Sequence, residues 1–226
     1  YLERKWGVYF CMGGTGKIVK ELENLMLRQG IEISKETDVE RISIKDGRAE
    51  GVILTSGRKI PADLVICNAD PPTVYSEMLP PQYSRDSLFK PKKFTHYSMG
   101  LYVLFFGSRK KFSDVAHHTI WMSERYRELL HDIFEKKILT DDFSLYLHRP
   151  TATDNTFAPE GCDSFYVLCP VPNLQGNVQW NLEGPKLKDR IVEALDKTIM
   201  PGLNENIEAE FWMTPEDFKN DYRSKY

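Results

Sequence analysis

The hydrophobic positions of this chain form one helical stripe among several short, strand-like runs. An aromatic run at 6–10 predicts a strand that leads into a Gly-rich turn. Between Thr15 and Gly30 the hydrophobic residues recur at helical spacing, which predicts a helix with Thr15 as its N-cap and Gly30 as its stop. Runs at 31–34 and 39–44 then fit strands.

Two turn signals divide the next part of the chain into a hairpin and a returning strand. Asp-Gly at 46–47 and Ser-Gly at 56–57 separate the preceding run from runs at 52–55 and 64–67. The run at 64–67 is apolar throughout, as expected of a strand that is covered on both faces. A helix, a hairpin and a returning strand together predict an α/β arrangement.

After the proline pairs at 71–72 and 80–81, strand-like runs alternate with helical stripes. The predicted strands cover 98–106, 117–122, 143–148, 164–169 and 207–212. The predicted helices cover 73–79, 84–89, 125–136, a segment that starts at Pro185 and ends before Pro201, and a helix start at 214–217. This order predicts the α/β class in its mixed α+β form, with a mixed, mostly antiparallel sheet and helices on one face.

Composition limits the classes of function that fit. The chain has 226 residues, 41% of them hydrophobic, and can bury a core, whereas its formal net charge of -3 gives no basic surplus for nucleic acid. No apolar run approaches the roughly 18–20 residues that cross a bilayer. The cysteines show neither CxxC pairs nor metal-ligand spacing, so we expect reduced thiols in a cytoplasmic protein; they are Cys11, Cys67, Cys162 and Cys169.

Two motifs suggest a phosphate site and a metal site, but neither has the arrangement that such a site needs. The string GGTGK at 13–17 resembles part of a phosphate loop, but Cys11 stands where the first glycine belongs and Ile18 where a Ser or Thr belongs. The expected role of this turn is therefore to pack a helix against a sheet. Neighbours on a strand face opposite sides, so we do not expect His117 and His118 to share a metal ion, and we predict no metal site.

A polar row on the strand at 143–148 is the candidate for chemistry. Alternation places Ser144, Tyr146 and His148 on one face, and Arg149 follows directly. A row that ends in His and Arg can line a cleft and stabilise charge, so His148 and Arg149 are the candidate catalytic residues. The alternative is a half-exposed strand face with a hydrogen-bonded histidine.

The order and spacing of several strings resemble the carotenoid desaturases of the phytoene desaturase type over nearly the whole chain. The strings are ERKWGV at 3–8, GGTG at 13–16, CNAD at 67–70, AHHTI at 116–120, RYREL at 125–129, the stretch 141–174, EGP at 183–185, MPGL at 200–203 and TPEDF at 214–218. The resemblance implies an FAD enzyme with an amine-oxidase-like fold that desaturates phytoene toward lycopene or a related polyene.

For the cofactor, the resemblance implies that Val39 contacts the adenine part of FAD and that Asn68 and Ala69 lie at a neighbouring strand end. It also implies an internal fragment, which we expect to bind FAD weakly or not at all and to be inactive alone. The implied domains are the end of a substrate-domain segment, a partial FAD-binding domain and a substrate-binding domain, at 1–10, 11–70 and 71–226.

For the substrate, the resemblance implies a long polyene hydrocarbon, phytoene, in an apolar tunnel, with His148 and Arg149 near its reactive end. The expected walls of the tunnel are Tyr102, Phe106, His118 and Tyr146. Because this hydrocarbon dissolves in the bilayer, we expect peripheral membrane contact, and homo-oligomerisation stays open. Two alternatives also stay open: a carotenoid isomerase or other oxidising relative of the same fold, and a non-catalytic lipid-binding module.

Overall fold

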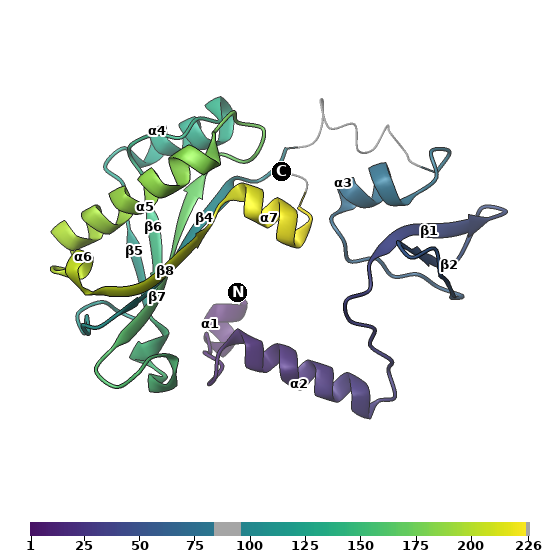
Figure 1. Ribbon diagram of the computed structural model, residues 1–226, viewed down its shortest axis with the longest axis horizontal. Helices are drawn as coiled ribbons and strands as arrows, with labels where there is room; N and C mark the ends of the chain where they lie inside the picture. Colours follow the sequence, from purple (N-terminus) through teal and green to yellow (C-terminus); the bar gives the residue numbers. More distant parts are fainter. Residues whose placement is uncertain (84–95, 225–226) are drawn as a thin grey trace. The chain divides into compact units, whose positions relative to one another are not determined.

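The computed structural model describes residues 1–83 and 96–224, which form two compact units (Figure 1). The large unit combines Tyr1–Glu32 with Ser98–Asp217, and the small unit combines Ile33–Tyr97 with Phe218–Tyr226. These units do not follow the domain ranges implied by the resemblance, since residues 11–32 group with the large unit. The functional ranges stay a prediction, because compactness alone does not assign a role to a domain.

Five strands of the large unit form one antiparallel sheet in the order β5-β6-β7-β4-β8. The strands are β4 (Gly100–Ser108), β5 (His118–Trp121), β6 (Leu145–His148), β7 (Asp163–Val171) and β8 (Ile207–Met213). All five runs predicted after the proline pairs are therefore confirmed as strands. Phe105 of β4 lies opposite Tyr166 of β7 and opposite Phe211 of β8, so these three residues form a row across the sheet.

One face of this sheet is covered by helices and holds the core. Figure 1 shows α5 (Trp180–Lys197) and α6 (Leu203–Asn206) lying across the sheet. Leu187 and Ile191 of α5 are fully buried in one cluster with Leu104 and Val167 of the sheet. Burying such a side chain contributes about 1.5–3 kcal/mol, so this face holds the unit together. The alternate residues of the strands point to the other face, which stays partly exposed.

The helix predicted at 125–136 is confirmed, whereas α5 begins earlier than predicted. α4 (Tyr126–His131) continues into a π-helical turn, η2 (Asp132–Lys136), and together they match the predicted range. The predicted start of α5 at Pro185 is wrong, because the helix begins at Trp180. Trp180 is buried and Gly184 packs against Trp212, so tertiary contacts extend the helix ahead of the proline.

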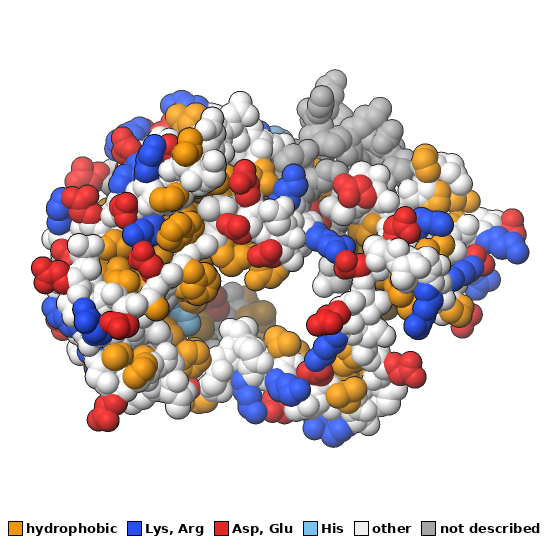
Figure 2. All heavy atoms as spheres, viewed as in Figure 1, with side chains coloured by type: hydrophobic (Ala, Val, Ile, Leu, Met, Phe, Trp, Pro, Cys, Tyr) orange, Lys and Arg blue, Asp and Glu red, His pale blue; other side chains and the backbone are white. Residues whose placement is uncertain are grey.

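The N-terminal residues differ from the strand predicted at 6–10. Leu2–Trp6 form a short helix, α1, and residues 7–11 carry no regular structure. A strand needs a hydrogen-bonded neighbour, and no described strand pairs with this segment. The next helix is confirmed as α2 (Thr15–Arg28), but the predicted N-cap is wrong: Gly14 is the N-cap and Thr15 is the first helical residue. None of the residues of α2 is buried. Figure 2 shows hydrophobic side chains exposed along it among charged ones.

The small unit contains an antiparallel meander of β1 (Val39–Lys45), β2 (Arg48–Leu54) and β3 (Lys59–Pro61). The hairpin turn at 46–47 is confirmed, and both of its residues have the positive φ that such tight turns require. A short helix, α3 (Pro71–Thr73), runs into the π-helical η1 (Val74–Met78), which confirms the helix predicted there.

Two runs of the small unit that were predicted as strands are not strands. Residues 31–34 and 64–67 carry no regular structure, and Leu64 and Ile66 are 74% and 87% exposed. An apolar strand that is covered on both faces needs partners on either side, and none of the described strands supplies them. The helix predicted at 84–89 lies outside the described residues.

The last helix, α7 (Pro215–Tyr222), confirms the predicted helix start. The N–H and the hydroxyl of Thr214 both donate to Oδ2 of Asp217, each at 2.7 Å, so a carboxylate binds back to the start of the helix. Within residues 1–83 and 96–224, we find no helix with both the length and the apolar character needed to cross a bilayer.

Candidate functional site

The open face of the five-stranded sheet carries an apolar hollow of about 520 Å³. Its floor is the row of Phe105, Tyr166 and Phe211, and the rings of Phe105 and Phe211 stack with centroids 4.5 Å apart. Phe10 and Phe157 add rings at the side, whereas His148 is one of the few polar side chains of the lining. A concave surface of this kind suits a hydrocarbon rather than a charged ligand.

The N-terminal glycines close one side of this hollow. The N–H of Gly13 donates to Oδ2 of Asp154 at 2.8 Å. Gly14 has φ 81° and lies so close to Phe157 that a Cβ would stand 2.7 Å from the ring. The turn therefore docks α2 onto the loop between β6 and β7, which agrees with a packing role rather than a phosphate-binding one.

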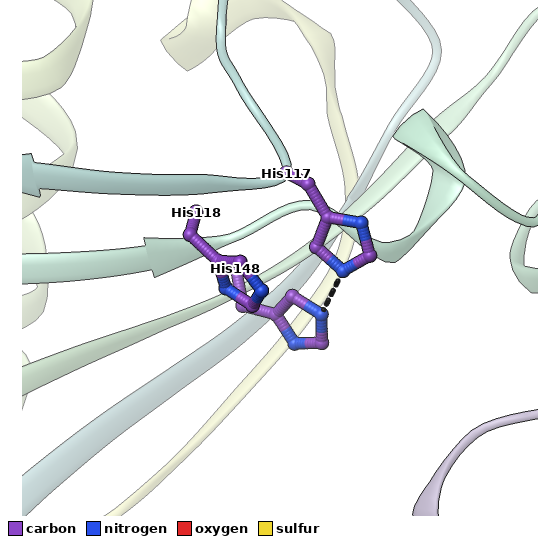
Figure 3. A group of neighbouring side chains, drawn as sticks. All are labelled: His117, His118 and His148. Carbon is purple, nitrogen blue, oxygen red and sulfur yellow. Dashed lines mark hydrogen bonds between the residues drawn. The ribbon is translucent and has the colours of Figure 1, made fainter. Parts of the chain in front are cut away.

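Three histidines meet at the ends of β5 and β6, beside the hollow (Figure 3). His118 is directly opposite His148 in the strand register, and Nε2 of His148 lies 2.7 Å from Nε2 of His117. The expectation that His117 and His118 face opposite sides is wrong. The backbone bends at His117, just before β5 begins, so the alternation of a strand does not apply and the two rings lie 4.5 Å apart.

Burial keeps two of these imidazoles uncharged. It lowers the pKa of His148 to about 4, and the neighbouring His117 and His118 add to the shift. Burial also lowers the pKa of His117, helped by the charge of His118 when protonated and by Arg149. At neutral pH, the lining of the hollow therefore presents an uncharged imidazole.

Arg149, the second candidate catalytic residue, does not line the hollow. Its side chain is buried, with Nε 3.1 Å from Oδ2 of Asp163, and Nη1 donates to the carbonyls of Phe112 and Val115 at 2.9 and 2.6 Å. The guanidinium thus anchors the segment that leads to His117. Its position supports a structural role in holding the histidines, not contact with a ligand in the hollow.

The four predicted substrate residues lie in different places. Phe106 borders the hollow, but its ring is buried on the core face with that of Tyr102, because it alternates with Phe105 along β4. Tyr102 is fully buried there and donates its hydroxyl to the carbonyl of Gly184 at 2.9 Å. His118 and Tyr146 lie beside the hollow, joined by a 2.6 Å hydrogen bond between Nδ1 and the phenol oxygen. The structure therefore brings neither the Tyr102 ring nor the Phe106 ring to the hollow.

Sequence reasoning missed most of the rings that form the hollow. Phe105 and Tyr166 could have been found, because they alternate with the core positions of β4 and β7. Phe10 reaches the hollow from an irregular segment and Phe157 from a single 3₁₀ turn, so neither belongs to an alternating pattern that the sequence would reveal.

The predicted cofactor residues lie together in the small unit. Val39, Asn68 and Ala69 line one pocket of about 850 Å³, whose rim also carries Asp38 and Arg223, joined by an ion pair of 2.6 Å. Carboxylate, amide and hydroxyl groups surround this pocket, and these groups are suited to the hydroxyl and amino groups of a nucleotide. The structure therefore brings these three residues to one site.

Comparison with known proteins gives related sequences for nearly the whole chain. It is 44% identical to the lycopene-forming phytoene desaturase of Pseudescherichia vulneris, over 96% of this chain and 44% of that protein. It is 39% identical to the neurosporene-forming phytoene desaturase of Rhodobacter capsulatus, over 99% of this chain and 44% of that protein. The chain thus spans less than half the length of these relatives.

The fold also has a solved counterpart. An oxidoreductase from Methanosarcina mazei superposes with a TM-score of 0.62 at 18% identity, over 90% of this chain and 42% of that one, which shows a shared fold. Residues 1–199 match the model of the flavin containing amine oxidoreductases, so the expected amine-oxidase-like fold is confirmed. With a match over most of its length, the chain belongs to the flavin containing amine oxidoreductase family.

Proposed function

We propose that this chain forms part of an FAD-dependent carotenoid desaturase, which dehydrogenates phytoene toward lycopene or a related polyene. The names of its relatives support this substrate class. The structural observation that carries the proposal is the ring-lined hollow on the open face of the sheet.

A polyene hydrocarbon offers no polar group for recognition, so its affinity has to come from apolar contact. Each buried methylene contributes about 0.8 kcal/mol when it leaves water. The row of Phe105, Tyr166 and Phe211 supplies flat, apolar surface against which a conjugated chain packs. The rings hold the hydrocarbon and exclude water, while His148 places an uncharged polar group next to the polyene.

The polar pocket of the small unit fits part of FAD. Val39, Asn68 and Ala69 are the residues that would hold it there. When bound, FAD supplies the acceptor for the hydride that leaves the polyene. We keep the expectation, implied by the resemblance, that this chain alone binds FAD weakly or not at all.

The substrate also argues for a place at a membrane surface. A long polyene is dissolved in the bilayer, and moving it through water costs free energy. An enzyme that acts on it is therefore best placed in peripheral contact with the membrane, on the cytoplasmic side. The exposed hydrophobic side chains of α2, among them Val19 and Leu22, support such contact.

A chimera tests the proposed activity. The segment of the Pseudescherichia vulneris desaturase that aligns with this chain is replaced by these 226 residues, and the product is expressed in cells that make phytoene. The chimera is expected to bind flavin, measured by its visible absorbance, and to convert phytoene to a coloured polyene, measured by chromatography. Phe211→Asp should reduce conversion at least tenfold, because it places a charge in the hollow.

Phe134→Asp is the matched control for that variant. Phe134 and Phe211 are 42% and 58% exposed, but only Phe211 lines the hollow, so the Phe134 variant should retain activity. A flavin-loaded chimera that leaves phytoene unchanged would contradict desaturation. A product that is only isomerised or oxygenated would indicate the relatives of the same fold instead, and binding of phytoene without any product would indicate a lipid-binding module.

A further inference from the structure

The strand register brings three imidazoles to one point of the large unit. His118 opens β5, His148 ends β6, and the bend at His117 turns its ring toward both of them. One ring nitrogen of each residue lies within 4.8 Å of those of the other two (Figure 3). Each of these positions is set by backbone pairing, since the N–H of Arg149 also donates to the carbonyl of His117 at 2.9 Å.

From this geometry we propose that His117, His118 and His148 bind one divalent first-row transition-metal ion. Two imidazole nitrogens on a tetrahedral ion lie about 3.3 Å apart when each metal–nitrogen distance is about 2.0–2.1 Å. The separations here run from 2.7 Å, between Nε2 of His117 and Nε2 of His148, to no more than 4.8 Å. The ion replaces the proton that those two nitrogens share. The nitrogens have to move by about an ångström to reach the separations that the ion requires.

The exposed ring of His118 can make most of this adjustment. Rotation about the bond that joins an imidazole to its Cβ has a broad, shallow profile, so reorienting a ring costs little. His118 is exposed, and its ring lies stacked on that of His148 with centroids 5.2 Å apart. It can therefore turn its nitrogen toward the ion without disturbing the core.

The outer hydrogen bonds of the cluster already select the ligand nitrogens. Nδ1 of His117 bonds to Oγ1 of Thr153, and Nδ1 of His118 bonds to the hydroxyl of Tyr146 at 2.6 Å. Metal-binding histidines characteristically engage their second nitrogen in this way, which sets the tautomer and leaves the other nitrogen to bind the ion. Nε2 of each of these two residues is thereby directed to the ion.

The donor set decides the class of ion. Three imidazole nitrogens, with no carboxylate in the cluster, suit Zn²⁺, Co²⁺, Ni²⁺ or Cu²⁺ rather than Mg²⁺ or Ca²⁺, which prefer oxygen. The ion joins the four-residue edge strand β5 to β6, the strand with which it pairs, and so acts as a staple at the end of the sheet. Metal binding does not depend on the desaturase proposal, because it requires neither flavin nor polyene.

The test uses the 226-residue chain after treatment with a chelator. Titration with Co²⁺ should give visible d–d absorption that saturates at one ion per chain, and Zn²⁺ should displace it stoichiometrically. Zn²⁺ should also raise the melting temperature and slow amide exchange in β5. His118→Ala should weaken Co²⁺ binding at least tenfold; because His118 is exposed, this variant keeps the fold, which circular dichroism verifies.

His131→Ala is the matched control. His131 is an exposed histidine at the end of α4 and lies outside the cluster, so its removal should leave the titration unchanged. His117→Ala and His148→Ala should each weaken binding as His118→Ala does. Titrations of the parent chain that do not saturate at one ion, or equal binding by the His118 and His131 variants, would overturn the proposal and leave only a hydrogen-bonded trio.

Discussion

Arg149 and Asp163 are oppositely charged and buried together beneath the segment that leads to His117. Asp163 also accepts from the N–H of Phe112 and from the hydroxyl of Thr151, each at 2.8 Å. These contacts join the end of β6, the start of β7 and the segment ahead of β5. The placement of the histidines therefore depends on a pair of charges that contact no ligand.

Arg149→Ala is expected to lower the free energy of unfolding by about 3–5 kcal/mol, because it leaves the carboxylate of Asp163 buried without its partner. Urea unfolding followed by tryptophan fluorescence measures the loss. Arg109→Ala is the control, since Arg109 and its partner Glu208 are both more than half exposed, and its cost should stay below about 1 kcal/mol. Equal losses in the two variants would contradict the anchoring role.

Asp154 predicts a pH dependence of stability. Hydrogen bonds from the Thr156 hydroxyl, and then from the N–H groups of Gly13 and Thr156, lower the pKa of its carboxyl. A lowered folded-state pKa means that the carboxylate stabilises the fold above the ordinary Asp pKa of about 3.9. This contribution is lost as the pH falls through the lower, folded-state pKa.

Asp154→Asn should therefore destabilise the chain more at pH 7 than at pH 3. Urea midpoints of the variant and the parent chain at the two pH values give the comparison. A difference that stays constant, or grows in acid, would contradict the assignment.

At the scale of elements, the turn at Gly13 and Gly14 links α2 to a loop 141 residues away along the chain. Gly14 combines φ 81° with ψ -178°, a conformation that is nearly restricted to glycine. No residue of α2 itself is buried, so this turn is a main point at which the helix is held.

Gly14→Ala should reduce stability by about 1–3 kcal/mol, because the new methyl group meets both an unfavourable backbone conformation and the ring of Phe157. Gly16→Ala is the control: a Cβ there meets nothing within 4 Å, so that variant should be neutral or more stable by up to about 1 kcal/mol. Thermal unfolding of the two variants measures both effects. A loss for Gly16→Ala that matched the loss for Gly14→Ala would argue against docking through Gly14.

The elements that could be predicted are those whose signal is local. Runs of apolar residues identified the strands of the large sheet, and Asp-Gly at 46–47 identified the β1–β2 hairpin of the small unit. The apolar run at 64–67 was misleading because a strand exists only where another strand pairs with it. The candidate site was half predictable: His148 lay on the correct face, but the bend at His117 and the ring of Phe157 depend on tertiary contacts.

At the scale of the whole molecule, the two units bury very unequal cores. In the large unit, 19 buried residues form one hydrophobic cluster. Among the described residues of the small unit, the buried hydrophobic side chains are Ile42, Leu54 and Val74. Since apolar burial provides most of the driving force, the small unit should be the less stable one.

Unfolding in urea should therefore take place in two steps. All four tryptophans, at 6, 121, 180 and 212, belong to the large unit, so their fluorescence reports on that unit, whereas far-ultraviolet circular dichroism reports on both. The dichroism should begin to change at a lower urea concentration than the fluorescence. Coincident curves would mean that the chain unfolds in one cooperative step.

The row of Phe105, Tyr166 and Phe211 lies on the face of the sheet that α5 does not cover. Substitutions in this row can lengthen, narrow or reshape the hollow without loosening the core on the other face of the sheet. Under the proposed function, substitutions there retune which hydrocarbon is accepted while the scaffold stays unchanged.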